Sequence, residues 1–144
     1  MTDISGELKV KFQVGDSMPE FVTPAMSRTH FVRYAGASGD FNPMHHDDVF
    51  AKAKGSPQVF GQGMLTAGIL GQAIARWVGP CAIRSFRTRF SGQVWPGDVL
   101  TCGSKVVRVY DEGELVRVEL ECWVKNQSNR IVLNGSAVVG PYTN

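Results

Sequence analysis

One short stretch of this sequence, residues 38–45, combines residue types that can move protons. It reads Ser-Gly-Asp-Phe-Asn-Pro-Met-His and places a carboxylate, Asp40, five positions before an imidazole, His45. Gly39 permits a tight entry, and Pro43 fixes φ and cannot continue a helix, so a short rigid loop is expected. A carboxylate and an imidazole on such a loop can hold and activate a water molecule, because a general acid or base needs fixed geometry first and a suitable pKa second.

The pattern Asp-x-Asn-Pro-x-His in this stretch resembles the signature of the MaoC-like, (R)-specific enoyl-CoA hydratases and 3-hydroxyacyl thioester dehydratases. The surroundings are similar to that family as well. Residues 34–39 precede the signature as they do in the family, and the family's second motif is matched by residues 61–66, Gly-Gln-Gly-Met-Leu-Thr. The resemblance runs from about Gly15 to the last expected strand, so it covers nearly the whole chain.

The resemblance implies a reaction and roles for particular residues. Asp40 and His45 would be the acid/base pair that adds water to a 2-enoyl thioester, or removes it from a 3-hydroxyacyl thioester, with no organic cofactor and no metal. The substrate would be an acyl-CoA or an acyl-carrier-protein thioester. The backbone N–H of Gly63 would stabilise the enolate-like oxygen, since helix N-termini carry unpaired N–H groups. Asn42 either orients the water or the pair, or holds the loop as an Asx-turn residue.

An apolar helix is expected over residues 63–78. Its sequence leaves almost no polar face, and a helix that is apolar nearly all round is buried. Small residues recur along it, and because glycine inside a helix costs about 1 kcal/mol relative to alanine, they indicate close approach by backbone or ligand. We expect a substrate tunnel beside this helix, past Met64, Ala67, Gly68 and Gly71. Tight packing of the helix on a sheet is the alternative explanation for the small residues.

The remaining sequence predicts helices early and strands late. Ser27 is expected to cap a helix over residues 28–37, and Asp47 a short helix ended by Gly55. Alternation of apolar and polar residues predicts a short strand or an extended arm near residues 8–14 and strands near 86–90, 99–110, 116–124 and 131–139. A further extended stretch is expected over 21–26, and a hairpin turn at 111–113. Helices followed by strands indicate the α+β class.

We expect one domain over residues 1–144, with an antiparallel sheet wrapped around one long buried helix. This is the hot-dog architecture, and the family resemblance implies the same fold. It also implies a homodimer with its active sites at the subunit interface. A heterodimer with a related subunit stays open.

The composition narrows the class of protein. Charged residues make up 19% of the 144 residues, below the roughly 25% usual for globular domains, as expected if one face is buried in an oligomer. The net charge of +2 is too small to indicate nucleic-acid binding. The three cysteines lack metal-type spacing, which argues against a disulfide framework or a zinc site. No signal peptide and no membrane-spanning stretch is evident, so a cytoplasmic location is expected.

Three other interpretations of the sequence compete with the hydratase. The run His45-His46-Asp47-Asp48 invites a metal site, although adjacent residues generally cannot all point at one ion. A hot-dog acyl-CoA thioesterase would direct a carboxylate-activated water at the carbonyl carbon. A non-catalytic acyl-thioester-binding subunit of a heterodimeric dehydratase would be expected to lose one of the two acid/base residues. Because Asp40 and His45 are both present, the hydratase is favoured.

Overall fold

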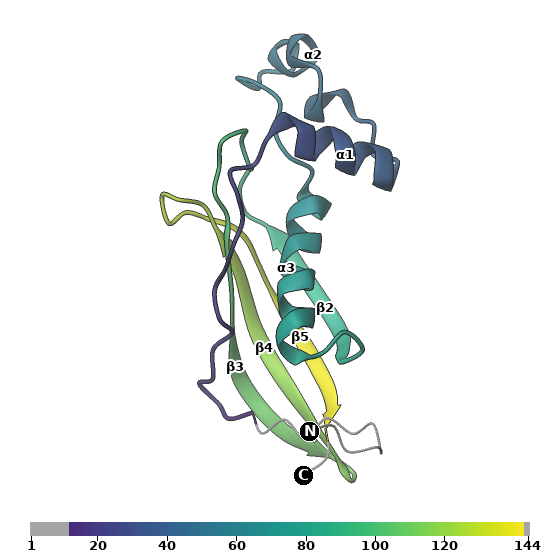
Figure 1. The fold of residues 1–144 in the computed structure, drawn as a ribbon, viewed down its shortest axis with the longest axis vertical. Helices are drawn as coiled ribbons and strands as arrows, with labels where there is room; N and C mark the ends of the chain where they lie inside the picture. Colours follow the sequence, from purple (N-terminus) through teal and green to yellow (C-terminus); the bar gives the residue numbers. More distant parts are fainter. Residues whose placement is uncertain (1–11, 143–144) are drawn as a thin grey trace.

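The computed structural model describes residues 12–142, which form three α-helices, one 3-10 turn and five strands (Figure 1). In chain order the elements are β1 (Phe21–Val22), α1 (Arg28–Ser38), the 3-10 turn η1 (Pro43–His45), α2 (Asp48–Ala53), α3 (Gly63–Val78), β2 (Ile83–Phe90), β3 (Thr101–Glu112), β4 (Leu115–Lys125) and β5 (Ile131–Tyr142).

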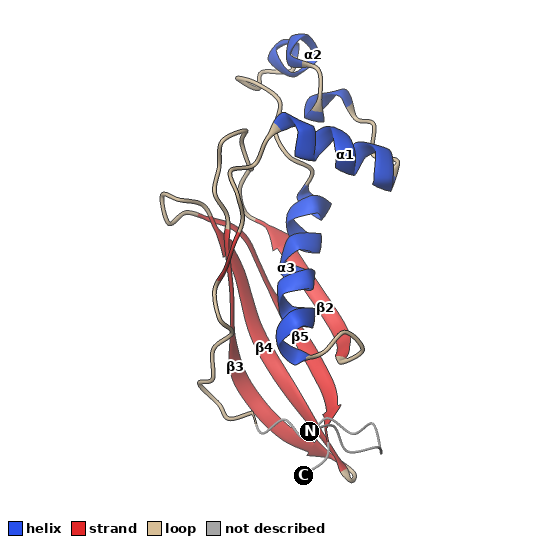
Figure 2. Ribbon diagram, viewed as in Figure 1, coloured by secondary structure: helices blue, strands red, loops and turns tan. Residues whose placement is uncertain are grey.

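The five strands form one antiparallel sheet in the order β1-β3-β4-β5-β2 (Figure 2). Regular alternation explains β4, in which every second residue from Val116 to Val124 is buried against the core. Strand β2 lies at one edge, and within the described residues it pairs only with β5. Its outer edge therefore presents backbone N–H and C=O groups on which a further strand can pair.

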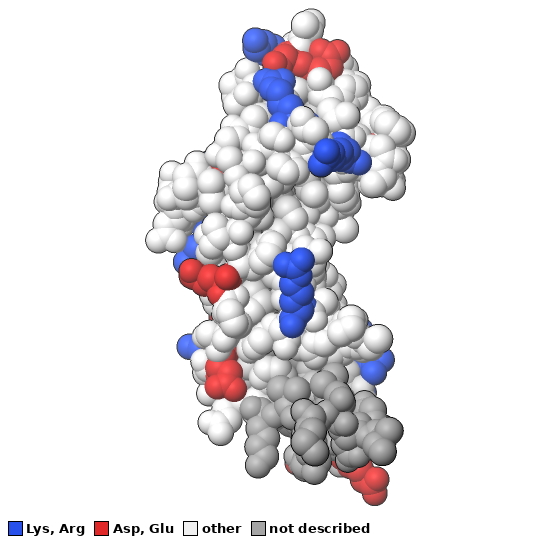
Figure 3. Space-filling model, in the orientation of Figure 1, with Lys and Arg blue, Asp and Glu red and all other residues white. Residues whose placement is uncertain are grey.

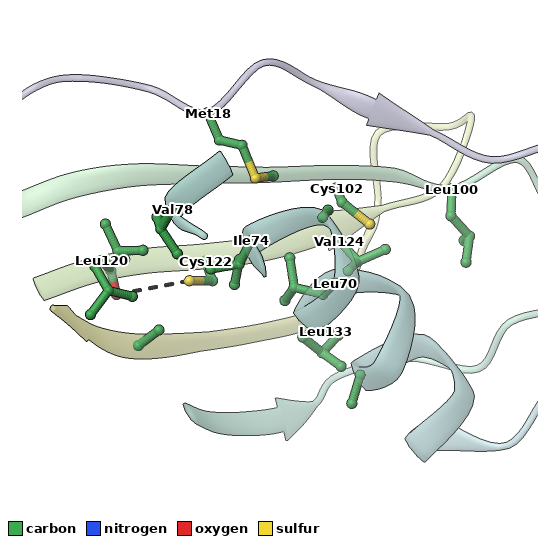
Figure 4. Close-up of a cluster of buried hydrophobic side chains, with 14 of the residues drawn as sticks. Met18, Leu70, Ile74, Val78, Leu100, Cys102, Leu120, Cys122, Val124 and Leu133 are labelled. Carbon is green, nitrogen blue, oxygen red and sulfur yellow. Dashed lines mark hydrogen bonds between the residues drawn. The ribbon is translucent and has the colours of Figure 1, made fainter. Parts of the chain in front are cut away.

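Helix α3 lies along one face of the sheet, and its inward side chains form the centre of the core. Leu70, Ile74 and Val78 point toward the strands (Figure 4) and are buried together with Leu120 and Leu133. Burying a side chain of this size contributes about 1.5–3 kcal/mol relative to leaving it exposed. This contact fixes the position of α3, and with it the position of the helix N-terminus at Gly63.

The opposite face of α3 is open, which corrects the expectation of a helix buried all round. Met64 is 58% exposed, and Gly68, Gln72 and Arg76 continue the exposed strip. The sheet covers only one side of the helix, and Figure 3 shows that much of this view of the molecule lacks charged side chains. None of the described helices is long and apolar enough to cross a membrane.

The two shorter helices are capped as the sequence predicts. Ser27 Oγ accepts the N–H of His30 at 3.3 Å, and His30 Nδ1 accepts the N–H of Ser27 at 2.9 Å, so α1 begins with a capping box. Gly39, with φ of 76°, ends α1 in the left-handed region. Asp47 Oδ1 accepts the first N–H groups of α2 at 2.9 and 3.1 Å. Both helices lie beyond the N-terminal end of α3 (Figure 1).

Several element boundaries differ from the prediction. The strand expected over residues 8–14 falls partly outside the described residues, and 12–14 are not in a strand. The extended stretch 21–26 contains only the two-residue β1. Strand β2 begins at Ile83, three residues early, because it pairs there with Val139 of β5. The hairpin between β3 and β4 turns at Gly113–Glu114, since β3 continues through Glu112.

Candidate active site

The loop between α1 and α2 is held in shape by its own short polar side chains. Ser38 Oγ accepts the N–H of Asp40 at 3.2 Å, and Asp40 Oδ1 accepts the N–H of Asn42 at 3.3 Å. Asn42 Oδ1 in turn accepts the N–H of Met44 at 3.1 Å and caps η1. Asn42 thus makes the contact of an Asx-turn residue. One oxygen of the Asp40 carboxylate braces the loop, while the other faces His45.

The imidazole of His45 is fixed by the backbone of a distant segment. Its Nδ1 lies 2.8 Å from the carbonyl oxygen of Phe60. A carbonyl oxygen can only accept, so Nδ1 carries a proton, and in the neutral imidazole Nε2 presents a lone pair. The N–H of Phe60 donates back to the carbonyl oxygen of Met44 at 3.3 Å. These two hydrogen bonds tie η1 to residue 60 and select one tautomer of the buried ring.

Asp40 and His45 meet as two hydrogen-bond acceptors. Asp40 Oδ2 lies 3.6 Å from His45 Nε2, which is too long for a direct hydrogen bond. The carboxylate side chain is 44% exposed and the imidazole side chain 10%, so solvent reaches the pair from the Asp40 side. A single water molecule can donate one hydrogen to each acceptor. The arrangement is suited to binding a water and removing one of its protons.

The start of α3 presents unpaired backbone donors. Gln62 is the N-cap residue, and its carbonyl accepts the N–H groups of Leu65 and Thr66 at 3.1 and 3.4 Å. The N–H groups of Gly63 and Met64 have no partner within residues 12–142. Such groups at a helix N-terminus carry partial positive charge and can stabilise an anionic oxygen. A Cβ at Gly63 would stand 3.0 Å from the Phe90 ring, so a side chain there would crowd this approach.

Residues 60–63 join the two halves of the candidate site. The carbonyl of Phe60 holds His45, and Gly63 follows only three residues later, a distance of at most about 10 Å along the chain. Between them, the N–H of Gly61 donates to the carbonyl of Val94 at 2.8 Å, and Gln62 is buried. The Asp40–His45 pair and the backbone N–H of Gly63 are therefore held by the same short segment.

The residues expected to line a tunnel share one face of α3 but differ in burial. Met64 and Gly68 are exposed, Gly71 is half-buried beside Phe86, and Ala67 is buried against the sheet. A cavity of about 400 Å³ lies along a neighbouring strip of α3, facing α1. Its lining includes Leu65, Ile69 and Gln72 from α3, and His30, Arg33 and Tyr34 from α1.

The polar residues after His45 have separate structural contacts. Asp47 caps α2, and Asp48 forms a 2.8 Å ion pair with Arg28. The hydrogen bond from Arg28 holds the pKa of Asp48 below its usual range. His46 is exposed, and its Nε2 lies 3.3 Å from a loop carbonyl. Within residues 12–142, no three His, Cys, Asp or Glu side chains are grouped as metal ligands.

Two supporting contacts at the site could not be predicted from the sequence. The Phe60 carbonyl belongs to the backbone, which has no residue-specific signature. The side-chain amide of Gln62 donates to the carbonyl of Phe31 at 3.0 Å, across 31 positions of sequence. A polar residue before an apolar helix ordinarily suggests an exposed cap. The sequence did not show that the side chain of Gln62 is buried.

Residues 11–127 match the model of the MaoC like domain. The peroxisomal hydratase-dehydrogenase-epimerase of Saccharomyces cerevisiae is 35% identical over 101 residues, which make up 70% of this chain and 10% of that protein. The peroxisomal enoyl-CoA hydratase 2 of Arabidopsis thaliana is 36% identical over 101 residues, which make up 68% of this chain and 30% of that protein. The chain thus spans 10% and 30% of the length of these two relatives.

A solved structure shows the same arrangement of sheet and helix. The unliganded R-hydratase PhaJ1 from Pseudomonas aeruginosa superposes with a TM-score of 0.80 and 26% sequence identity. The superposition covers 92% of this chain and 84% of that one.

Proposed function

The chain belongs to the MaoC-like domain family and has the hot-dog fold, and from this premise we propose that it is a hydro-lyase. The reaction is the (R)-specific hydration of 2-enoyl thioesters, or in reverse the dehydration of (3R)-hydroxyacyl thioesters. The thioester is carried by CoA or by an acyl-carrier protein. The catalytic groups are the chain's own side chains and backbone, without an organic cofactor.

Asp40 and His45 act on one water molecule. As the water oxygen bonds to C3, its proton passes to the pair, and the C2–C3 double-bond electrons shift toward the thioester carbonyl. The enolate that results then takes a proton at C2 from the pair, which restores the thioester. One water is consumed and both of its parts are found in the product. Because the same pair removes and returns the proton on one side of the substrate, addition is syn.

Gly63 stabilises the charge that develops on the thioester oxygen. Its N–H begins α3, and a preorganised backbone donor at a helix N-terminus is commonly among the largest catalytic contributions. Asn42 supports the reaction indirectly, by holding the loop that carries the acid/base pair. The contact from Asn42 Oδ1 to the Met44 N–H supports this role.

The acyl chain runs beside α3, past Met64, Gly68 and Gly71, with Ala67 beneath them. The space around Gly68 supports this path, because an added Cβ there would meet nothing within 4 Å. At Gly71 an added Cβ would meet only the Phe86 ring, at 3.6 Å. Small residues on this strip leave room for an extended apolar chain.

The protein works as a homodimer, or as a heterodimer with a related subunit. The unpaired edge of β2 and the open face of α3 lie on one chain, and both need a covering partner. A cytoplasmic location is part of the proposal. All three cysteines are free thiols, which is typical of a reducing compartment.

The single observation that carries the proposed reaction is the 3.6 Å approach of Asp40 Oδ2 to a His45 Nε2 whose opposite nitrogen is held by Phe60. Purified protein should be given crotonyl-CoA and longer enoyl-CoAs while the absorbance of the conjugated thioester is followed. Hydration predicts loss of this absorbance without release of free thiol. Release of free CoA would instead indicate a thioesterase, and an unchanged absorbance would refute the hydratase.

A further inference from the structure

We propose that Gln62 is a positioning residue, whose side-chain amide holds the α3 N-terminus in register with the helix that leads to Asp40. The inference rests on the proposed hydratase function and extends it to a residue that does not touch the substrate. Gln62 is 1% exposed, and its Nε2 donates to the carbonyl oxygen of Phe31, in the first half of α1, at 3.0 Å.

The contact joins the two elements whose relative position sets the site. α1 ends at Ser38, two residues before Asp40, so a shift of α1 moves the carboxylate. Gln62 immediately precedes Gly63, so a shift of residue 62 moves the backbone donor. The Phe31 ring adds a steric contact from the same helix, because a Cβ at Gly61 would stand 2.8 Å from it. The side chain of Phe31 thus packs on residue 61, and its carbonyl holds residue 62.

Within residues 12–142, this amide makes the one hydrogen bond that joins α1 directly to residues 60–63. His45 is held by the carbonyl of Phe60, and Gly61 is held by Val94, which lies in the loop after β2. Neither hydrogen bond involves α1. Within the described residues, the other polar links reach only residues 58–60, through Arg28 to Gln58, through the Asp48 partner of Arg28 to Val59, and through His45 to Phe60. Without the amide of Gln62, the position of α1 relative to residues 61–63 depends on apolar packing, which fixes direction less strictly than a hydrogen bond does.

The side-chain amide of Gln62 makes a single hydrogen bond among the described residues. Its effect on catalysis can therefore be measured separately from its effect on stability. Gln62 Oε1 is buried and has no hydrogen-bond partner among the described residues. Gln62→Met keeps the length of the side chain, removes one hydrogen bond and also removes one unsatisfied acceptor. The two changes oppose one another in the free energy of unfolding. The carbonyl of Phe31 retains its place in the helical ladder of α1. Folding should therefore persist while the register loosens.

The experiment compares hydration of crotonyl-CoA by wild type, Gln62→Met, Gln62→His and Gln93→Met. Gln62→Met should lower kcat by about 10- to 100-fold, the scale on which a small misplacement acts. Its KM should stay within about threefold, its thermal midpoint should be close to wild type, and the pH dependence of kcat should keep its shape. Gln62→His retains an N–H donor and should recover much of the loss. Gln93 is exposed in a loop, and Gln93→Met should match wild type.

The outcomes separate this inference from the proposed function. Wild-type turnover in Gln62→Met, when wild type hydrates and Asp40→Asn does not, would overturn the role of Gln62 and leave the hydratase standing. A Gln62→Met protein that unfolds, or that loses stability with normal kcat in the folded fraction, would show a purely structural residue and also overturn the role. Equal losses in Gln62→His and Gln62→Met would exclude the donor contact. Absence of hydration by wild type would refute the proposed function, and this inference with it.

Discussion

At the scale of single residues, the candidate site has one ring nitrogen of His45 free for proton transfer, the Nε2 atom. The Nδ1–H of His45 is committed to the carbonyl of Phe60, so only Nε2 can exchange a proton with a bound water. In the proposed reaction Nε2 takes a proton from that water, and Asp40 Oδ2 lies 3.6 Å from Nε2. The two side chains share one task, and substituting them should show it.

Replacing either partner should slow hydration at least about 100-fold, the usual contribution of a positioned acid or base. Asp40→Asn keeps the size of the side chain and removes its charge, whereas His45→Ala removes the imidazole. The double variant should lose little more than the slower single variant, because residues that act as a unit are strongly non-additive. Initial rates with crotonyl-CoA and thermal midpoints should be measured on the same preparations.

His46→Ala is the matched control, since this imidazole neighbours His45 but is exposed, and it should keep wild-type turnover. Near wild-type turnover in folded Asp40→Asn would end the hydratase assignment. Lower stability with normal turnover per folded molecule would mean that the pair only holds the loop.

A contact could be predicted from the sequence when both of its residues lie close together in the chain. Asp40 and His45 lie five positions apart around a proline, and the structure brings them within 3.6 Å. Asp47 reads as a helix cap, and it is one. The contact of Gln62 with Phe31 joins residues that only the folded chain brings together. Local sequence therefore indicated the candidate pair but not the distant contacts that hold it in place.

At the scale of elements, α3 combines a packing face with an open face. Leu70 and Ile74 lock one side to the sheet, while Gly68 and Gly71 leave space on or beside the other. A helix held this firmly can accept a larger side chain on its open strip without losing its place. That makes the proposed path of the acyl chain testable by adding bulk to it.

Gly71→Leu should fold and should shift the preference toward shorter acyl chains, or weaken all substrates. The added Cβ meets only the Phe86 ring, at 3.6 Å, so the new side chain projects into the proposed path. Hydration rates should be compared for enoyl-CoAs of four, six and ten carbons. Gly36→Leu is the control, because this glycine is also helical and an added Cβ meets nothing within 4 Å. An unchanged chain-length profile in Gly71→Leu would contradict the tunnel.

The elements themselves were predictable where one pattern decided them. The α+β class and the hot-dog architecture are confirmed by the antiparallel sheet, the long helix and the similarity to a solved structure. They could be predicted because clean alternation indicated β4 and a long apolar run indicated α3. The early start of β2 depends on pairing with Val139, a partner more than fifty positions away. The open face of α3 could not be distinguished from a buried one, because an apolar residue type does not indicate whether the sheet of the same chain, another chain or solvent lies against it.

At the scale of the whole molecule, residues 12–142 leave two surfaces uncovered, the outer edge of β2 and the open face of α3. We therefore expect a dimer or larger assembly in sedimentation experiments. Phe90→Asp, which places a charge at an exposed end of β2, should shift the assembly toward monomer. Val49→Asp, at an exposed apolar position of α2, should leave it unchanged. A well-behaved wild-type monomer with full activity would contradict the dimer.

Alkaline pH should destabilise the fold through groups buried in the core. Burial raises the pKa of Cys102 from 9.0 to about 12 and that of Tyr142 from 10.0 to about 12. The unfolded chain therefore loses these protons first, so their contribution to stability is complete below about pH 9 and is lost as pH rises toward 12.

The thermal midpoint should fall between pH 9 and 11. The fall should be shallower in Cys102→Ala, although its stability at neutral pH is lower. Cys81→Ala, which removes the exposed thiol, should follow wild type. If the thermal midpoint of Cys102→Ala falls as steeply with pH as that of wild type, groups other than Cys102 cause the alkaline destabilisation.

The uncovered edge of β2 also bears on how a newly made chain survives before it finds a partner. This eight-residue strand has one side that no other described strand pairs with, and such an edge is a template on which an exposed strand of another chain can pair and start aggregation. Arg87 and Arg89 stand exposed at alternate positions along it, and like charges on an edge repel a second copy that approaches out of register. The lone chain therefore owes part of its colloidal stability to two positive charges, and a polyanion that masks them would promote precipitation.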